Sequence, residues 1–488
     1  MDTLADDFAS EREPPTRVAL VIDALRARIE SRALGRGARL PSVRRLADEL
    51  QVSKSTVVEA YDRLAAEGAV EARRGSGFYV AAAPQPLLLA RAPNLDPAVD
   101  LLAIMRRELE TRPDVIQPAS GWLPESWLPA AAVEKAVRAV ARSGGPARLR
   151  YDSPLGFEPL RKVIAARMLE RGLKADPSQI VVTDSTTQAI DLACRFFLSP
   201  GDRVVLDDPR YFNFVKLFDA HRARIVSAPH TREGPDIAAL EAIFAEHRPR
   251  LYVMIAGPHN PTGAVLSAAV AHRVLSLAER YDVVIVEDDV YGDLESISTP
   301  RLATSDAFDR VVYVAGYSKT VSGGMRVGWL VARPEWIGPI VDLKLATVLT
   351  NSAFAAATLH SLLTEGGYRR HLDGLRARLG EAIGRTCVRL KACGLTPWIE
   401  PQSGMFVWAE LPDGLDATAV ARAAQADKVV FAPGRSFSAS LRWRGFMRFN
   451  VAASADRNVF ETLERAMETA NANANANANA VDPLAAKS

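Results

Sequence analysis

Apolar residues in the first eighty positions recur at helical spacing and then alternate. Residues 17–33 carry an apolar stripe on one face, which predicts an amphipathic helix. Ser42 and Ser53 each stand before a further helical stripe, where a serine hydroxyl can cap free backbone N–H groups. Gly68 marks the end of the third helix. Residues 69–80 then read as two short strands around a turn.

A helix, a helix-turn-helix and a β-wing in this order predict a winged helix-turn-helix over residues 1–80. In this motif the third helix enters the major groove of double-stranded DNA, and flanking cations contact phosphates. Residues 1–80 hold 13 Lys and Arg against 13 Asp and Glu, but residues 26–80 hold 11 against 7, a net charge of +4. A small protein-binding winged helix is the alternative that the pattern leaves open.

Further along the chain, a lysine follows a short apolar run. Lys319 comes after the strand predicted at residues 311–314, and Arg326 stands seven residues further on. This arrangement suits pyridoxal 5′-phosphate (PLP), because the lysine supplies the amine for a Schiff base and the arginine supplies a permanent cation for the phosphate. Taken alone, a lysine in a glycine-rich turn is more often simply solvated.

Two upstream turns carry the groups that the ring of this cofactor needs. Asp288 ends an apolar strand, and a carboxylate against the pyridine nitrogen keeps the ring protonated. Tyr291 and Asn260, the latter in the turn 258–263, are candidates for hydrogen bonds to the phenolic oxygen. A solvated strand end is the alternative for the acids, and we expect His259 to be a turn residue only.

Three more segments complete the set. Ser185 and Thr186 lie between a predicted strand and a helix, where backbone N–H groups and hydroxyls can hold an anion, although a plain N-cap is the alternative. Tyr211 follows another short strand and is placed to stack on the pyridine. Arg448 lies within the alternating run 446–451, and its planar fork suits an α-carboxylate.

In this order the segments resemble the fold-type-I, aspartate-aminotransferase-like PLP domains, over residues 114–470. The resemblance implies an α/β fold, with a large domain around a mixed sheet and a small C-terminal α+β domain. It implies that Lys319, Asp288 and Tyr291 are catalytic and that Arg448 binds a substrate carboxylate. The residues that it assigns to the cofactor are Ser185, Thr186, Tyr211, Asn260, Asp288, Tyr291, Lys319, Arg326 and Tyr151, the last donated across a dimer interface.

The chain departs from this family at three places. Gly316 stands where the family usually has a small hydroxyl residue, and Ser185 stands where it usually has glycine. Gly323 and Gly324 replace the commoner proline before the arginine. None of these changes removes a group that PLP binding needs, so they bear on the affinity for its phosphate and on catalytic speed.

The N-terminal segments 40–47 and 52–57 closely resemble the GntR family of bacterial regulators, and residues 75–77 resemble its wing. By this resemblance Arg44, Lys54 and Thr56 contact DNA. The further candidates for DNA contact are Ser53, Ser55, Arg73 and Arg74.

A GntR-type winged helix joined to an aminotransferase-like domain resembles the MocR/GabR subfamily of transcriptional regulators, and residues 287–291 and 431–434 resemble its YdcR-like branch. The resemblance implies a homodimeric, PLP-dependent regulator that binds paired half-sites. It would sense PLP, or an amino acid or amine bound through an aldimine. Ligand binding would shift the position of the aminotransferase-like domain, here called the core, relative to the DNA-binding winged helix, here called the reading head. The alternative is an aminotransferase acting on an amino acid and a 2-oxo acid, with an appended DNA-binding domain.

Composition sets further limits. The three cysteines, Cys194, Cys387 and Cys393, have no paired spacing, which predicts reduced thiols in the cytoplasm. No stretch approaches the roughly 20 apolar residues of a membrane span, and the first twelve residues are too acidic for a signal peptide. No His/Cys cluster suggests a metal, so we expect none.

Two segments are expected to lie outside the folded domains. Residues 81–113 form a proline-containing linker that spans roughly 30 Å, long enough to exchange reading heads between the subunits of a dimer. Residues 471–480 are Asn-Ala repeats, and with the polar end they predict a disordered tail over 471–488.

Overall fold

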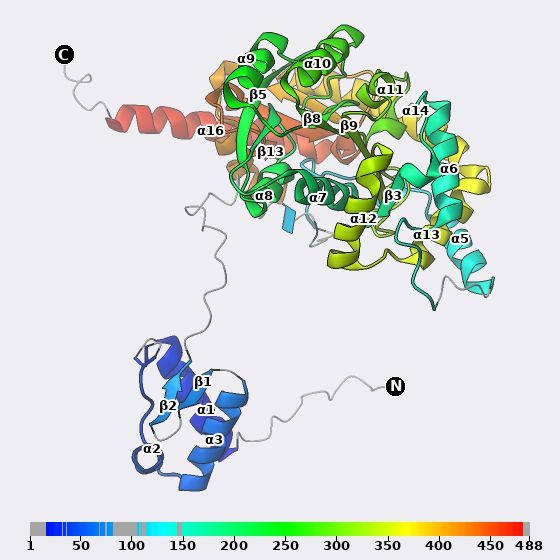
Figure 1. Cartoon of the computed structure of the whole chain (residues 1–488). Coiled ribbons are helices and arrows are strands. Elements are labelled where there is room, and N and C mark those ends of the chain that lie inside the picture. Colours follow the sequence, from blue (N-terminus) through cyan, green and yellow to red (C-terminus); the bar gives the residue numbers. More distant parts are fainter. Residues whose placement is uncertain are drawn as a thin grey trace, which may run out of the picture. The chain divides into compact units, whose positions relative to one another are not determined.

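The computed structural model describes residues 16–31, 33–35, 37–67, 69–73, 76–81, 105–106, 109, 114–143 and 149–481, without the side chains of residue 30 and residues 477–481. The chain divides into two compact units, Met1–Arg91 and Ala92–Ser488 (Figure 1). The division falls inside the expected linker, most of which lies outside the described residues. Each unit has a hydrophobic core of its own.

The N-terminal unit is a winged helix-turn-helix, which confirms the prediction. Its elements are α1 (Arg17–Glu30), α2 (Val43–Leu50), α3 (Lys54–Ala66), β1 (Val70–Arg73) and β2 (Gly77–Val80). The first helix ends short of the predicted residue 33. Ser42 and Ser53 cap α2 and α3, as expected, by accepting the backbone N–H groups of Arg45 and Thr56. Leu25, Leu46, Val57 and Leu64 meet in the core between the helices.

The larger unit is built on an eight-stranded mixed sheet. Its strands are β3 (Ile180–Thr183), β4 (Arg203–Asp208), β5 (Arg224–Thr231), β6 (Gly234–Pro235), β7 (Leu251–Ile255), β8 (Val284–Asp288), β9 (Val311–Gly316) and β10 (Gly328–Val331). They lie in the order β3-β10-β9-β8-β7-β4-β5-β6. Strand β10 runs antiparallel to both of its neighbours and β6 antiparallel to β5, whereas the other pairs are parallel.

Helices cover both faces of this sheet (Figure 1). Successive strand residues point to opposite faces, and both faces are apolar: Val253 and Val286 belong to one buried cluster, Tyr252 and Ile285 to the other. The helices are α5 (Ala130–Arg142), α6 (Glu158–Glu170), α7 (Thr186–Phe197), α8 (Asn213–Ala220), α9 (Ile237–His247), α10 (Ala268–Tyr281), α11 (Leu302–Asp306), α12 (Pro334–Val348) and α13 (Ala353–Thr364).

A small antiparallel sheet of four strands forms the C-terminal part. Its strands, in spatial order, are β11 (Thr396–Pro397), β12 (Phe406–Glu410), β14 (Phe446–Asn450) and β13 (Ala432–Pro433). The accompanying helices are α14 (Gly367–Ala392), α15 (Ala417–Ala424) and α16 (Arg457–Val481). Phe449 of β14 and Leu206 of β4 share one buried cluster, so the two sheets pack together. This is the expected fold, a mixed-sheet large domain with a small α+β domain.

The Asn-Ala repeats differ from the expectation of disorder. Helix α16 continues through them to Val481, and residues 482–488 lie outside the described part of the chain. Alanine has the highest helix propensity, and adding turns to a helix already anchored by packing requires no new nucleation. Among the described residues no helix is long and apolar enough to cross a membrane.

Candidate functional site

The predicted cofactor residues lie along one edge of the large sheet. Ser185, Lys319, Asp288, Asn260 and Tyr211 lie at or beyond the carboxyl ends of β3, β9, β8, β7 and β4. These five strands run in the same direction and stand in that order in the sheet, with β10 inserted after the first. Carboxyl ends of such strands form the usual binding crevice of an open α/β sheet. The topology therefore gathers turns that are far apart in the sequence.

Three successive acids end β8, and their partners differ. Glu287 accepts two backbone N–H groups from the start of α11. Asp289 is paired with Arg171 and Arg301. Asp288 has one hydrogen bond within the described residues, from a backbone N–H two positions on. Of the three, Asp288 keeps the most capacity to accept a further hydrogen bond, which agrees with its predicted role.

Burial dominates the electrostatics of Asp288. Loss of solvent raises its pKa to about 7, and the neighbouring Asp289 carboxylate acts in the same direction. The hydrogen bond from Val290 and the charge of Lys319 act against this shift. A cationic N–H beside Asp288 would therefore relieve a buried carboxylate that lacks a full set of partners.

Four predicted residues form a continuous set of contacts. Arg448 Nη1 donates to Asn260 Oδ1 at 2.8 Å, and Asn260 Nδ2 donates to the Tyr291 hydroxyl at 3.2 Å. Lys319 Nζ lies 5.9 Å from the centre of the Tyr291 ring. Arg448 is buried, with its guanidinium over the ring of Phe406 at 4.4 Å. The predicted carboxylate-binding arginine thus lies next to the predicted cofactor residues.

A segment that the sequence analysis missed closes this set into a ring. We call residues 119–122 the strip. Lys319 Nζ donates to the strip at the carbonyl of Gly121, at 2.8 Å, and Arg448 Nη2 donates to the strip at another carbonyl. Buried Asn450 donates to two more strip carbonyls, at 2.9 and 2.8 Å. Carbonyls have no side-chain signature, and the available signal was Asn450, which shares a face of β14 with Arg448.

The N-terminus of α7 is pressed against two glycines. Ser185 Oγ caps the helix by accepting the N–H of Gln188 at 3.1 Å. A Cβ on Gly328 would lie 2.8 Å from the Thr186 nitrogen, and one on Gly316 would lie 3.3 Å from the Thr186 side chain. Glycine at 316, the departure from the family pattern, therefore has a steric reason. The packed helix N-terminus is suited to an anionic phosphate.

Two residues predicted to bind the cofactor, Arg326 and Tyr151, are not joined to this ring of contacts. Arg326 is exposed, in left-handed backbone with φ of 51°. Tyr151 is 81% exposed. Within the described residues no hydrogen bond connects either side chain to the residues above. Their roles therefore stay predictions.

Tyr211 lies in a group of aromatic side chains next to this ring of contacts. Its ring centre is 5.0 Å from that of Phe212 and 5.4 Å from that of Phe214. It is close enough to Tyr291 to raise the pKa of that phenol, although burial contributes more. The position is compatible with the predicted stacking role.

These features fit PLP at three separate points. Asp288 offers a buried carboxylate with spare acceptor capacity, and Asn260 and Tyr291 offer polar atoms beside it. Lys319 brings an amine to the same place. The start of α7, walled by Gly316 and Gly328, offers an anion site.

The structure also gathers a histidine cluster, which we did not expect. Asp207, His230 and His259 are buried and bring metal-ligand type atoms within 4.8 Å of one another. The two imidazoles stack at 4.2 Å with 23° between their planes, and Tyr252 donates to Asp207 at 2.6 Å. Nearly parallel rings do not direct two nitrogen lone pairs to one tetrahedral ion. The stacked arrangement of the two imidazoles therefore does not suit a tetrahedral metal centre.

This cluster holds the turn that carries Asn260. His259 Nδ1 lies 2.9 Å from the hydroxyl of Thr262, and both residues are buried. Burial lowers the pKa of His230 to about 4 and that of His259 well below its usual range. The rings are therefore neutral near pH 7, which agrees with the expected role of His259 as a turn residue.

In the N-terminal unit two predicted DNA-binding cations are free of acidic partners. Arg44 and Lys54 are exposed, and neither forms an ion pair within the described residues. Other arginines of this unit are neutralised by the protein, in the pairs Arg26–Glu67, Arg28–Glu49 and Arg63–Glu59. Arg44 and Lys54 therefore retain their charge for phosphates.

The hydroxyls at the start of α3 are bonded to one another. Ser53 Oγ accepts the Thr56 N–H at 3.1 Å and lies 2.8 Å from Ser55 Oγ and 2.7 Å from Thr56 Oγ1. Ser53 is thus a cap, whereas Ser55 is exposed on the helix surface. The cap at Ser53 was expected, and the DNA contacts of Thr56, and of Ser53 and Ser55 as further candidates, stay predictions.

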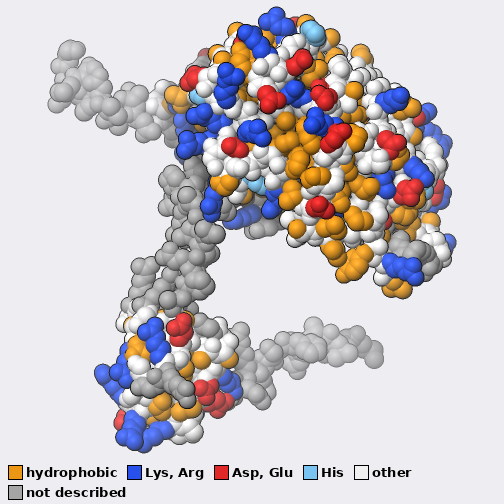
Figure 2. Space-filling model, in the orientation of Figure 1, with side chains coloured by type: hydrophobic (Ala, Val, Ile, Leu, Met, Phe, Trp, Pro, Cys, Tyr) orange, Lys and Arg blue, Asp and Glu red, His pale blue; other side chains and the backbone are white. Residues whose placement is uncertain are grey.

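In the wing, Arg73 is held by the protein. Its guanidinium lies 4.5 Å from the centre of the Tyr79 ring and 3.8 Å from the Glu71 carboxylate. Arg74, the other wing candidate, lies outside the described residues. Figure 2 shows Lys, Arg, Asp and Glu side chains interspersed on the visible face of this unit.

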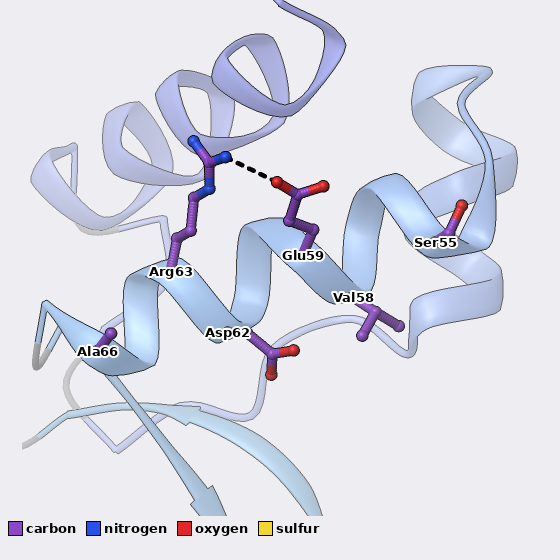
Figure 3. A pocket seen from close by; sticks show the side chains of 6 residues that line it. All are labelled: Ser55, Val58, Glu59, Asp62, Arg63 and Ala66. Atoms are coloured by element: carbon purple, nitrogen blue, oxygen red, sulfur yellow. Dashed lines mark hydrogen bonds and ion pairs between the residues drawn. The ribbon is translucent and has the colours of Figure 1, made fainter.

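The outer face of α3 changes character along its length (Figure 3). An open hollow of about 620 Å³ is lined by Ser55, Val58, Glu59, Asp62, Arg63 and Ala66. Its two acids lie beyond the first turn, and Glu59 is paired with Arg63 at 2.7 Å. Because acids repel phosphates, the cationic first turn, at Lys54, is the part of α3 suited to approach the backbone of DNA.

Comparison with known proteins agrees with both halves of the chain. The family "Aminotransferase class I and II" matches residues 120–466, and "Bacterial regulatory proteins, gntR family" matches residues 18–80. Similar proteins include the HTH-type transcriptional regulator YdcR of Escherichia coli, 30% identical over 88% of this chain and 94% of the relative. The probable rhizopine catabolism regulatory protein MocR of Rhizobium meliloti is 28% identical over 84% of this chain and 85% of its own.

The fold has a solved counterpart. The structure of LysN, the alpha-aminoadipate aminotransferase of Thermus thermophilus, covers 76% of this chain and 95% of its own, with 28% identity and a TM-score of 0.69. This domain type typically binds PLP. One conclusion follows from the winged helix-turn-helix, from the sheet edge that carries Lys319, and from the similar regulators that match most of the chain. The chain belongs to the MocR/GabR-type, GntR-family transcriptional regulators, in which a winged helix-turn-helix is fused to a fold-type-I aminotransferase-like domain.

Proposed function

We propose that this regulator depends on PLP and changes its DNA binding when PLP, or an amino acid or amine, occupies the core site. The main support for this proposal is the ring of contacts among Lys319, Tyr291, Asn260 and Arg448, in a chain that also has a winged helix-turn-helix. The ring presents an amine at one place and a forked cation at another. The fork of Arg448 suits the carboxylate of an amino acid, and the Lys319 amine marks where an effector amine would take its place on PLP.

The residues that would hold the cofactor are those already in contact around the sheet edge. Asp288 would accept the ring N–H, Asn260 and Tyr291 would bind the phenolic oxygen, and the start of α7 would bind the phosphate. When bound, PLP supplies an aldehyde that reacts reversibly with primary amines. Lys319 would compete with an effector amine for that group, while Arg448 would receive an α-carboxylate.

A solved relative supports an amino-acid effector over PLP alone. The LysN structure is described in complex with N-(5′-phosphopyridoxyl)-L-leucine, a compound of the cofactor and an amino acid. In this chain Arg448 is buried beside the Lys319 site, where an amino-acid carboxylate would need it. A sensor of PLP alone would have no use for that arrangement.

We further propose a cytoplasmic homodimer that exchanges reading heads and places them on paired half-sites of operator DNA. Leu149 and Tyr151 are 94% and 81% exposed, which is unusual for large apolar side chains and fits burial against a second copy. Figure 2 shows a broad hydrophobic stretch on the visible face of the larger unit. Sedimentation of the purified chain at micromolar concentration should give twice the monomer mass.

A DNA-binding titration tests the main proposal. The affinity for the DNA upstream of the chain's own gene is measured without ligand, with PLP, and with a panel of amino acids at saturating PLP. We expect a change of at least several-fold with PLP and a further change with one class of amino acid. Equal affinities under all conditions would reject a regulator that responds through the core.

Amino-group transfer is a second candidate function. The chain is 30% identical, over 73% of its length, to the 2-aminoadipate transaminase of Thermus thermophilus. Release of a 2-oxo acid from an amino acid, at more than one equivalent per protein, would show turnover. A change in DNA affinity without such release would favour the regulator.

A further inference from the structure

Trp122 is the side chain of the strip that stands beside the Lys319 amine. The Lys319 Nζ lies 6.0 Å from the centre of the Trp122 ring and 5.9 Å from that of Tyr291. The same Nζ donates to the carbonyl of Gly121 at 2.8 Å. Two aromatic rings and a backbone carbonyl therefore surround the amine.

The backbone of Trp122 is held at both its carbonyl and its N–H. Its carbonyl accepts from buried Asn450 Nδ2 at 2.8 Å and from the Ser120 hydroxyl at 3.2 Å. Its N–H donates to the same hydroxyl at 3.3 Å. The side chain itself is half-buried.

No other side chain of the strip competes with Trp122 for this position. Ala119 is buried, the Ser120 hydroxyl is turned to the strip backbone, and Gly121 has no side chain. Of the four side chains of the strip, the indole is therefore the one that lies beside the Lys319 amine, and the strip carbonyls connect this place to Arg448.

We infer that Trp122 sets the size of the effector, favouring amino acids with small side chains and excluding large ones. This inference rests on the proposed function, since it takes an effector whose amine occupies the place of the Lys319 amine. With its amine at the place of Lys319 Nζ and its carboxylate on Arg448, such an effector would carry its side chain beside the Trp122 ring. An indole is among the largest side chains, so it leaves little room there.

The chain offers a matched control. Trp127 belongs to the short 3-10 helix Glu125–Trp127, five positions after Trp122, and is also half-buried. Its ring lies under the Arg378 guanidinium at 4.0 Å. Trp127→Ala therefore removes the same side chain from the same stretch of chain.

The test compares the full-length, PLP-loaded wild type with Trp122→Ala, Trp122→Phe and Trp127→Ala. Glycine, alanine, leucine and phenylalanine are titrated against each protein, with binding followed by the cofactor absorbance and, in parallel, by DNA affinity. Wild type should bind alanine more tightly than phenylalanine. Trp122→Ala should raise the ratio of phenylalanine to alanine affinity at least tenfold, Trp122→Phe should fall between, and Trp127→Ala should match wild type.

The possible failures are distinct. If no amine binds to any of the proteins, the proposed amino-acid sensor is wrong and this inference falls with it. If amines bind with the same ratio in wild type and Trp122→Ala, only the role of Trp122 is overturned. A wild-type preference for phenylalanine also overturns it. Should Trp122→Ala fail to fold, the ratio in Trp122→Phe decides, because a smaller ring must still shift it.

Discussion

The two functional regions of this chain are built in opposite ways. Most of the proposed DNA contacts come from one short stretch, where Arg44, Ser53, Lys54 and Ser55 are exposed. The core site draws on positions from 119 to 450 and buries Asp288, Asn260 and Arg448. An exposed cation acts through its charge, which salt screens. The buried polar side chains of the core act through their geometry, and the loss of one leaves the hydrogen-bonding group of its partner unsatisfied. The same kind of substitution should therefore have different signatures in the two regions.

The largest effect should come from Lys319→Ala, which removes the amine that the described core residues surround. Borohydride reduction of the PLP-loaded wild type should fix the cofactor to a peptide containing Lys319, and the variant should give no fixed cofactor. DNA binding without effector should persist, because the reading head is a separate unit. Exposed Lys174→Ala is the control. Mapping of the adduct to a different lysine would contradict the assignment.

A loss of charge in the reading head should instead be visible in its salt dependence. In Arg44→Ala plus Lys54→Ala, the log–log slope of DNA affinity against salt should become shallower by about four units per dimer, one for each lost phosphate contact. Arg63→Ala, which removes an arginine already paired with Glu59, should change the slope little. Unchanged tight binding in the double variant would reject this DNA-binding surface.

Loss of the core arginine should be selective for the effector. Arg448→Ala should retain PLP but bind an amino-acid effector about 30–150-fold more weakly, since a charge-assisted fork contributes about 2–3 kcal/mol. Arg448→Lys keeps the charge without the fork and should fall between. Amino-acid response is measured through DNA affinity at saturating PLP. An unaltered response would remove Arg448 from the site and favour PLP itself as the effector.

Substitution of the buried Asp288 carboxylate should raise the stability of the core and lower its affinity for PLP. Burial raises the pKa of Asp288 from 3.8 to about 7, so its contribution to folding is most favourable at low pH and declines as the pH rises between these two values. Asp288→Asn should therefore stabilise the PLP-free core relative to wild type at pH 8, by up to about 4 kcal/mol, and much less at pH 4. Urea unfolding across this range measures the difference. PLP affinity should fall in the same variant.

The smallest effect separates capping from DNA contact in the reading head. Ser53→Ala should lower the stability of this unit by about 1 kcal/mol, as should Ser42→Ala at the other cap. If Ser53 is only a cap, both variants should lose DNA affinity equally and modestly. A much larger loss in Ser53→Ala, at equal thermal stability, would show that its hydroxyl also contacts DNA.

The sequence by itself determined the elements of both regions and much of the site. Helical stripes, serine caps and a two-stranded wing are local signals, so the pattern located α2, α3, β1 and β2 correctly. Short apolar strands ending in polar turns pointed to Lys319, Asp288 and Asn260 as candidates, and an alternating run pointed to Arg448. The strand order brought the three turns to one edge. Local signals were sufficient because each of these residues is specified by the chain beside it.

Only the tertiary structure decided what those residues touch. The strip at 119–122 holds Lys319 and Arg448 through backbone carbonyls, which every residue possesses and no sequence pattern marks. The stacking of His230 on His259 depends on the turn after β7 lying beside the end of β5, and the crowding of Gly316 depends on its packing against α7. Hydrogen bonds and steric contacts between distant segments follow from strand order and sheet packing, which appear only when the whole chain folds.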